Sequence, residues 1–349
     1  MTMAGRELNS TDEKDSDKRT ILSMSDFSFF LINRPLAVLN LLANIFFVFC
    51  LMTSKTQQVK QPLTILLGSM VSFTILYLLF FTLMTCILEW VESFVVVNII
   101  YAIVTFLTRG NMTTYVWLMF YYYIMIVPSQ QVLLLWVKKK IQSIIYLMML
   151  LDGVIFLGEA CFQIIYIMDY SRFYNGTESV YDEIDIAFFS IVNIYMFLCL
   201  FVMMISCFAT THYLNKHMKS LSASVGSLSN SRLHSQIRVT VTGIAQGGLC
   251  FLCTMWNPLY VISYFLSPYF YFDAYIHITV LNLYISGTTV NLGVGQTLFR
   301  ERAVHVWEAV KKILCTGKSS NDQRPPGNLV TMTSLSIIES SGVDTAMSL

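Results

Sequence analysis

Long apolar stretches alternate with short polar segments along most of this chain. Each stretch can cross a hydrocarbon layer about 30 Å thick, which takes roughly 20 helical residues. Because backbone N–H and C=O groups find no water inside lipid, each stretch is predicted to be an α-helix. The predicted spans are 35–54, 62–88, 95–127, 142–168, 185–211, 237–266 and 274–299. The pattern predicts an all-α membrane protein with a seven-transmembrane helix bundle. It argues against soluble enzymes, nucleic-acid binders and secreted modules.

The charges between the stretches differ in sign from one loop to the next. Alternate loops carry the bases Lys55, Lys60, Lys138, Lys139, Lys140, Lys216, Lys219, Arg232, Arg238, Arg300, Arg302, Lys311 and Lys312. The opposite loops carry Glu89, Glu92, Asp169, Glu178, Asp182, Glu183, Asp185 and Asp273, with Arg172 as their base. Since Lys and Arg are retained on the cytoplasmic side, the N-terminus is predicted to lie outside and the C-terminus inside.

Composition agrees with this organisation. The chain is 55% hydrophobic and 12% charged, and its net charge of +1 implies no general attraction to nucleic acid. Four regions are predicted: an extracellular disordered tail (1–34), a transmembrane domain (35–299), a cytoplasmic amphipathic helix (300–315) and a disordered cytoplasmic tail (316–349).

Modification signals fall on both sides of the predicted membrane. The sequons Asn9-Ser-Thr and Asn175-Gly-Thr lie on outer segments, where glycosylation is possible, whereas Asn111-Met-Thr lies inside a span. Cys315 follows the amphipathic stretch just inside the membrane. It is predicted either to be palmitoylated or to remain an unmodified tail thiol.

Charged residues also occur inside the spans, where they are costly unless paired. Arg109 lies about 12 residues, roughly 18 Å, from the outer end of the third span. Asp152 and Glu159 share one face of the fourth span, and Glu159 lies closer to the depth of Arg109. Glu159 is therefore the expected partner. The pair is either the polar floor of an outward-open ligand cavity or a buried ion pair that sets helix register.

The sixth span contains Trp256-Asn-Pro258. Proline inside a helix removes one backbone hydrogen bond and permits a kink. The motif is similar to the W-x-P hinge of rhodopsin-like receptors, and a plain kink without a signalling role is the alternative. The third span ends without D-R-Y, and the seventh has no N-P-x-x-Y.

A more specific resemblance lies at the end of the third span. Residues 121–141, YYYIMIVPSQQVLLLWVKKKI, resemble the F-Y-F-L-K-I-A and L-W-L-K-x-R-I segments of type 2 (bitter) taste receptors. His217-Met-Lys219 is similar to that family's H-T-K-K-M, and Gly295-Gln-Thr-Leu-Phe-Arg300 to its G-N-x-K-L-K. The outer sequon at Asn175 and the cysteine-free outer loop also fit.

This resemblance implies a chemosensory G-protein-coupled receptor of the plasma membrane. Its ligand would be a small organic agonist, held in an outward cavity between the third, fifth, sixth and seventh spans. The expected ligand-binding residues are Thr105, Thr108, Arg109, Glu159, Trp256, Tyr260 and Asn282. The heterotrimeric G protein is expected to contact Lys138, Lys139, Lys140, Lys216 and Lys219. Membrane lipid is the remaining expected partner, and no cofactor or metal is predicted.

The chain departs from the family pattern at several positions. Met125 replaces a lysine, Thr108-Arg109 replaces an Asn-His pair, and Thr288-Thr289 aligns with a His-Ser pair. These differences indicate a divergent member with unusual ligand chemistry.

Other functional classes remain as alternatives. A pheromone or other chemosensory receptor of the same fold would be favoured by an outer cysteine pair, which the sequence lacks. A transporter or channel would be favoured by internal repeats or rings of acidic residues. The five histidines lie in loops, near span ends or in the tail, so no catalytic constellation is predicted.

Overall fold

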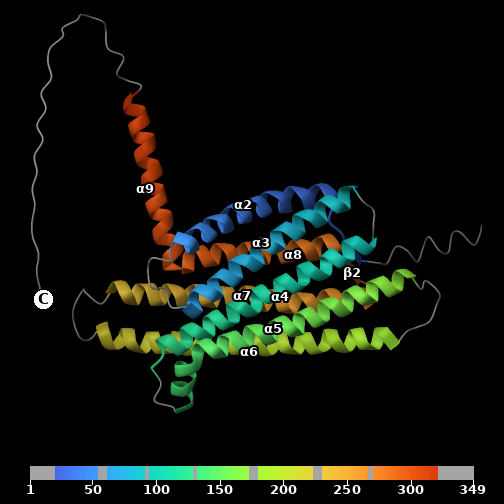
Figure 1. Cartoon of the computed structure of the whole chain (residues 1–349), viewed down its shortest axis with the longest axis horizontal. Helices are drawn as coiled ribbons and strands as arrows, with labels where there is room; N and C mark the ends of the chain where they lie inside the picture. Colours follow the sequence, from blue (N-terminus) through green and yellow to red (C-terminus); the bar gives the residue numbers. More distant parts are fainter. Residues whose placement is uncertain are drawn as a thin grey trace, which may run out of the picture. The chain divides into compact units, whose positions relative to one another are not determined.

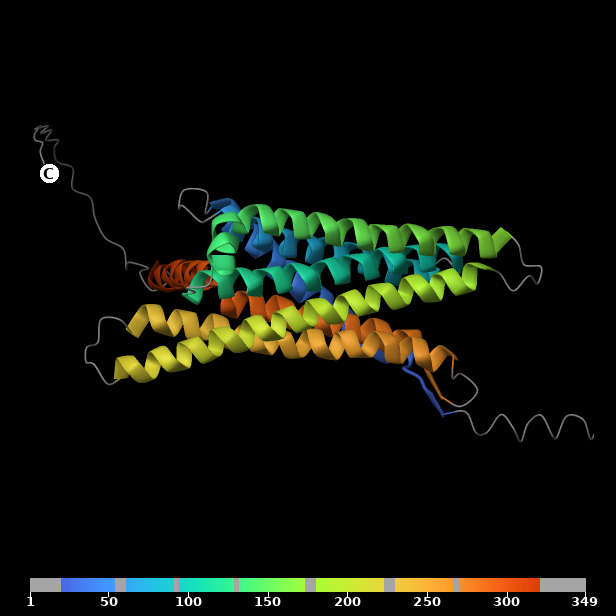
Figure 2. The same cartoon turned by 90° about the horizontal axis from the view of Figure 1, so that it is seen from below.

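The computed structural model describes residues 20–53, 61–90, 94–128, 132–172, 180–222, 230–265 and 270–320. Its helices are α2 (Asp26–Thr53), α3 (Gln61–Trp90), α4 (Phe94–Ile126), α5 (Val132–Arg172), α6 (Val180–Ser222), α7 (Asn230–Phe265), α8 (Ala274–Gly295) and α9 (Thr297–Ser320). Helices α2 to α8 run side by side along one direction (Figures 1 and 2). The chain up to Arg302 forms one compact unit, and the rest of α9 belongs to a second.

Within the described residues, six helices are long and apolar enough to cross a membrane. The qualifying stretches are Asp26–Thr53, Gln61–Ile87, Val95–Ile126, Leu134–Met168, Ala187–Lys216 and Ile237–Ser263. Their outer surfaces expose large apolar side chains, including Val38, Leu39 and Leu42 on α2, each at least 58% exposed. A water-soluble surface does not carry so large an apolar area. The protein is thus a multi-pass helical membrane protein.

Helix α8, the seventh span expected from the sequence, is not among these six. Its polar residues lower its hydropathy. Most of these polar residues, including Asn282, Thr288 and Thr289, are buried within the bundle. A helix enclosed by neighbouring helices can carry polar side chains that pair with those neighbours instead of facing lipid. The packing of α8 therefore explains why apolarity identifies it less clearly than the others.

The helices close into a ring. Helix α2 contacts α3 on one side and α8 on the other, and α7 lies between α6 and α8. Helix α4 contacts α3, α5 and α6, so it occupies the most enclosed position. Large side chains that are almost fully buried, among them Tyr77, Tyr115 and Phe156, fill the interior.

The first and last helices of the ring are joined by a ladder of side-chain hydrogen bonds. Asn33 donates to Thr279 Oγ1 at 2.8 Å, Asn40 donates to Ser286 Oγ at 2.6 Å, and Asn44 donates to Thr289 Oγ1 at 3.2 Å. The partners advance together along both helices, so α2 and α8 run parallel. Buried amides gain stability only when paired, so this ladder specifies how the two helices meet.

The N-terminal segment is more structured than the sequence predicted. Strand β1 (Thr20–Leu22) pairs in parallel with β2 (Phe270–Phe272), with Thr20 opposite Phe270. Helix α2 then begins at Asp26, well before the predicted start at 35. Residues 20–22 and 26–34, which the sequence placed in the tail, thus lie in a strand and in a helix. Asp273 holds the N-terminal segment against the start of α8. Its Oδ1 caps α8 by accepting from Tyr275 N at 3.3 Å, and its Oδ2 accepts from Met24 N at 3.4 Å.

Candidate functional site

Arg109 of α4 forms an ion pair with Glu159 of α5, as their depths in the sequence predicted. Their side chains are only 5% and 6% exposed. The second Glu159 oxygen accepts a long hydrogen bond from Gln163 Nε2, at 3.5 Å. A buried pair of this kind loses its hydration, so each charge depends on the other to remain ionised at low cost.

The second acidic residue of α5 has different partners. Asp152 accepts from Trp117 Nε1 at 2.7 Å and from the Tyr195 hydroxyl of α6. Trp117 lies about two turns beyond Arg109 on α4, and Asp152 about two turns before Glu159 on α5. The two contacts therefore fix one antiparallel register between these helices. A small cavity of about 30 Å³ lies beside Asp152, between α3, α4 and α5.

A polar and aromatic cluster joins α4, α7 and α8 near the start of α8. Trp256 Nε1 lies 3.1 Å from Nδ1 of His277, and the Tyr101 hydroxyl lies 2.8 Å from Nε2 of the same ring. Tyr260 stacks on that imidazole, with ring centroids 4.0 Å apart. His277 itself is only 2% exposed. One histidine thus connects two residues expected to bind ligand with a third helix.

The donors and acceptors of this cluster assign the histidine tautomer. An indole N–H only donates, so Nδ1 of His277 must accept. The neutral imidazole then carries its proton on Nε2 and donates it to the Tyr101 oxygen. A doubly protonated ring has no acceptor, so protonation of His277 would break the bond to Trp256.

Of the remaining predicted ligand residues, Thr105 lies beside the Tyr101 hydroxyl, whereas Thr108 and Asn282 have partners elsewhere. Thr105 is partly buried on α4, and Thr108 donates to the carbonyl of Val104 in its own helix at 2.8 Å. Asn282 is fully buried and donates to Asn33 Oδ1 at 2.9 Å, so it belongs to the contact between α2 and α8. Asn282 therefore faces α2, whereas Trp256 and His277 meet between α7 and α8.

A further network near the other end of the bundle was not anticipated from the sequence. Asn291 of α8 donates to Thr242 O at 2.7 Å, to Gln246 Oε1 at 3.1 Å and to the Tyr115 hydroxyl at 3.1 Å. Tyr122 of α4 adds a bond to Gln296 at 2.8 Å. These contacts link α4, α7 and α8 a second time. These residues come from three helices that are distant in sequence, so no sequence motif marks them.

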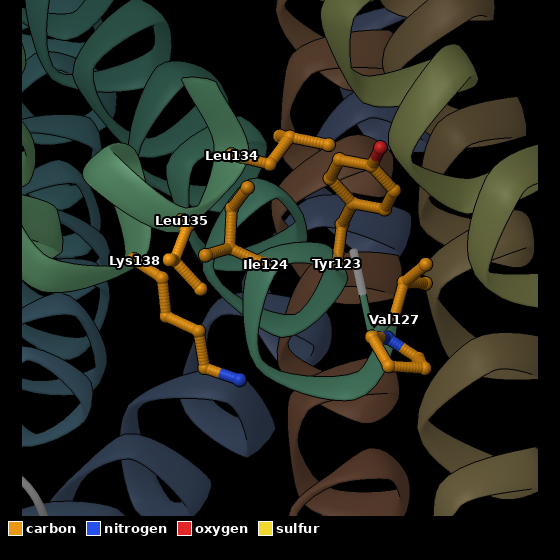
Figure 3. Close-up of a pocket in the computed structure, with 7 residues that line it drawn as sticks. Tyr123, Ile124, Val127, Leu134, Leu135 and Lys138 are labelled. Atoms are coloured by element: carbon orange, nitrogen blue, oxygen red, sulfur yellow. The ribbon is translucent and has the colours of Figure 1, made fainter. Parts of the chain in front are cut away.

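The lysines expected to contact a G protein are only partly described. Lys138, Lys139, Lys140 and Lys216 are exposed, whereas the side chain of Lys219 lies outside the described residues. Asn9 and Asn175 also lie outside them, as does the side chain of Cys315. A cavity of about 150 Å³ lies beside Lys138, where α4 ends and α5 begins (Figure 3).

Comparison of this chain with models of known protein families finds no match, and a search of curated proteins finds none either. Function is therefore inferred from the sequence and from the geometry of the described residues.

Proposed function

We propose that this protein is a chemosensory G-protein-coupled receptor of the plasma membrane, similar to bitter taste receptors. It binds small organic agonists at the outer half of the bundle and activates a heterotrimeric G protein on its cytoplasmic side. In this proposal α8 is the seventh span and the N-terminus lies outside. The charge asymmetry of the loops supports that orientation.

The contact between Trp256 and His277 carries this proposal. It ties α7 to α8 two residues before Pro258, where α7 lacks a backbone N–H donor. A ligand that replaced either partner would change the contacts between these helices just where α7 is least constrained. Ligand binding can shift an equilibrium only through such differential contacts.

The second network, around Asn291, provides a route by which a conformational change at the ligand site can reach the cytoplasmic side. It joins the same three helices, α4, α7 and α8, closer to the basic loops. A shift of α7 at Pro258 therefore reaches a second set of polar contacts. Exposed lysines such as Lys139 and Lys216 flank that end and suit a G-protein surface.

Arg109 and Glu159 give the proposed ligand site its charge. The guanidinium can hold a carboxylate or sulfate through two parallel hydrogen bonds. Because Arg109 is already paired, an acidic ligand would have to compete with Glu159 for it. This favours acidic or sulfated agonists that bring their own polar contacts to the released Glu159.

The experiment is a functional screen of the full chain in cultured cells. Cells carrying the receptor and a promiscuous G protein are exposed to a panel of bitter compounds, with intracellular calcium as the signal. At least one compound is expected to give a saturable response that untransfected cells lack. Surface-expressed protein that shows no response, and no agonist-dependent nucleotide exchange after purification, would contradict the proposal. Agonist-independent ion currents would instead favour a channel.

A further inference from the structure

The first part of α5 is set apart from the rest of that helix. At Lys140 the backbone leaves helical geometry, with φ −108° and ψ 15°. In both views the segment before this residue, 132–139, crosses the long direction of the bundle instead of following it (Figures 1 and 2). With the long axis of the bundle along the bilayer normal, as the proposed topology requires, this segment runs along the membrane surface.

This short segment exposes an apolar surface. Val132, Leu135 and Trp136 occupy neighbouring positions on one side of a helix, and they are 83%, 63% and 52% exposed. Three exposed lysines follow at once, at 138–140. The ammonium of Lys140 lies over the Trp136 ring, 5.4 Å from its centroid. Exposed apolar residues beside tryptophan and lysine are typical of helices that rest in the interfacial layer of a bilayer.

A cavity lies between this segment and the end of α4. Tyr123, Ile124, Val127 and Pro128 line it from α4 and the turn after it, and Leu134, Leu135 and Lys138 line it from α5. Lys138 extends along one side, with its ammonium toward the α4 turn (Figure 3). The walls are thus mostly apolar, with one cation at the edge.

We propose that this cavity and Lys138 bind the headgroup region of an anionic phospholipid. The phosphate pairs with the Lys138 ammonium, and the glycerol region enters the apolar cavity. The acyl chains stay in the leaflet in which Val132, Leu135 and Trp136 are seated. This site goes beyond the proposed function, since it requires a bilayer but neither an agonist nor a G protein.

Size and charge favour a lipid over a free small molecule. The cavity measures about 150 Å³, below the roughly 300 Å³ at which pockets for whole small-molecule ligands begin. It can enclose part of a molecule whose remainder lies elsewhere, as the chains of a lipid do. Bases next to a membrane-spanning helix attract anionic lipid through the surface potential of the leaflet.

Lys139 offers a matched control for Lys138. It neighbours Lys138 on the same helix and is also exposed, but it does not line the cavity. The full chain, purified in detergent, is incubated with phosphatidylserine or with phosphatidylcholine of the same acyl chains. Native mass spectrometry then measures the retained lipid. Lys138→Gln is expected to lower phosphatidylserine retention about fivefold, and Lys138→Arg to keep it. Lys139→Gln should stay within about twofold of the unmodified protein.

Several outcomes would overturn the proposal. Equal losses in Lys138→Gln and Lys139→Gln would indicate diffuse surface charge instead of a site. Equal retention of the two lipids would show that the headgroup charge is not recognised. Competition by soluble glycerophosphoserine or inorganic phosphate as strong as that by the lipid would assign a free-phosphate site. Unchanged lipid retention in Lys138→Gln, together with lost G-protein activation in cells, would assign Lys138 to the protein partner. Circular dichroism and thermal unfolding confirm that each variant is folded.

Discussion

Arg109 and Glu159 pair inside the bundle, where neither side chain is more than 6% exposed. The same two helices are joined again between Trp117 and Asp152, at 2.7 Å. The ion pair is therefore one of two polar contacts that hold α4 and α5 in register. Its partners can fulfil a structural role, a ligand-binding role or both, and mutations separate these roles.

Replacing Arg109 with alanine is expected to destabilise the protein by about 3–5 kcal/mol, because it leaves Glu159 buried without a partner. Thermal unfolding of the purified protein measures this loss. The double variant Arg109→Ala, Glu159→Ala is expected to recover much of it, since no charge is then stranded. If Arg109→Ala unfolds at the same temperature as the unmodified protein, the pair has no structural role.

The binding role of Arg109 makes a separate prediction. Among variants that reach the cell surface, Arg109→Ala is expected to lose responses to acidic or sulfated agonists, whereas Arg109→Lys should only weaken them. Lysine keeps the charge but not the two-pronged hydrogen-bonding geometry. Dose–response curves normalised to surface labelling give the measurement. Normal potency in surface-expressed Arg109→Ala would exclude the binding role.

The cluster around His277 predicts an effect of removing the imidazole. His277→Ala leaves the partly buried Trp256 N–H without its acceptor, which costs about 1–3 kcal/mol. The unfolding temperature should fall and basal signalling should change. Trp256→Phe in the same background should then add little, because the bond is already lost. If the effects of His277→Ala and Trp256→Phe on the unfolding temperature are fully additive, the two side chains are not energetically coupled.

Pro258 predicts a change in signalling with little change in folding. Pro258→Ala supplies the missing backbone N–H to α7 and stiffens it, so agonist efficacy should change at normal surface expression. Pro35→Ala is the matched control, because Pro35 also lies inside a helix, α2, but away from the Trp256 cluster. The hinge hypothesis fails if Pro258→Ala keeps both its efficacy and its basal signal.

The predicted topology has a direct test at Asn175. Glycosidase treatment should increase the gel mobility of the unmodified protein, and Asn175→Gln should remove most of this shift. Asn111→Gln is the control, since Asn111 is buried in α4 and donates to Thr74 at 2.9 Å. Protection of the segment 169–184 from protease added outside intact cells would reverse the proposed orientation.

Counting residues from the span ends was enough to anticipate the pairing of Arg109 with Glu159. Charges in lipid need partners at their own depth, and depth can be read from sequence position. The predicted start of the fourth span at 142 also falls close to the break in α5 at Lys140.

The contacts of His277 and Asn291 could not be read in this way. Their partners lie on helices distant in sequence, such as Tyr101, 176 positions before His277. Such pairs depend on how each helix is rotated about its axis, which apolar periodicity defines poorly when a helix is enclosed on most sides. Helix α8 is enclosed in this way and carries polar residues on several sides. Its sequence therefore does not indicate that Asn282 faces α2.

The ladder between α2 and α8 has a consequence for biosynthesis. Ribosomes deliver α2 to the membrane first and α8 last, so Asn33, Asn40 and Asn44 must wait in the bilayer without their final partners. In the proposed seven-span topology, α8 joins the bundle last and packs against the amides that α2 already carries. A chain that stops before Ala274 would expose those amides to lipid, which gives the cell's quality-control machinery a physical mark of an unfinished molecule.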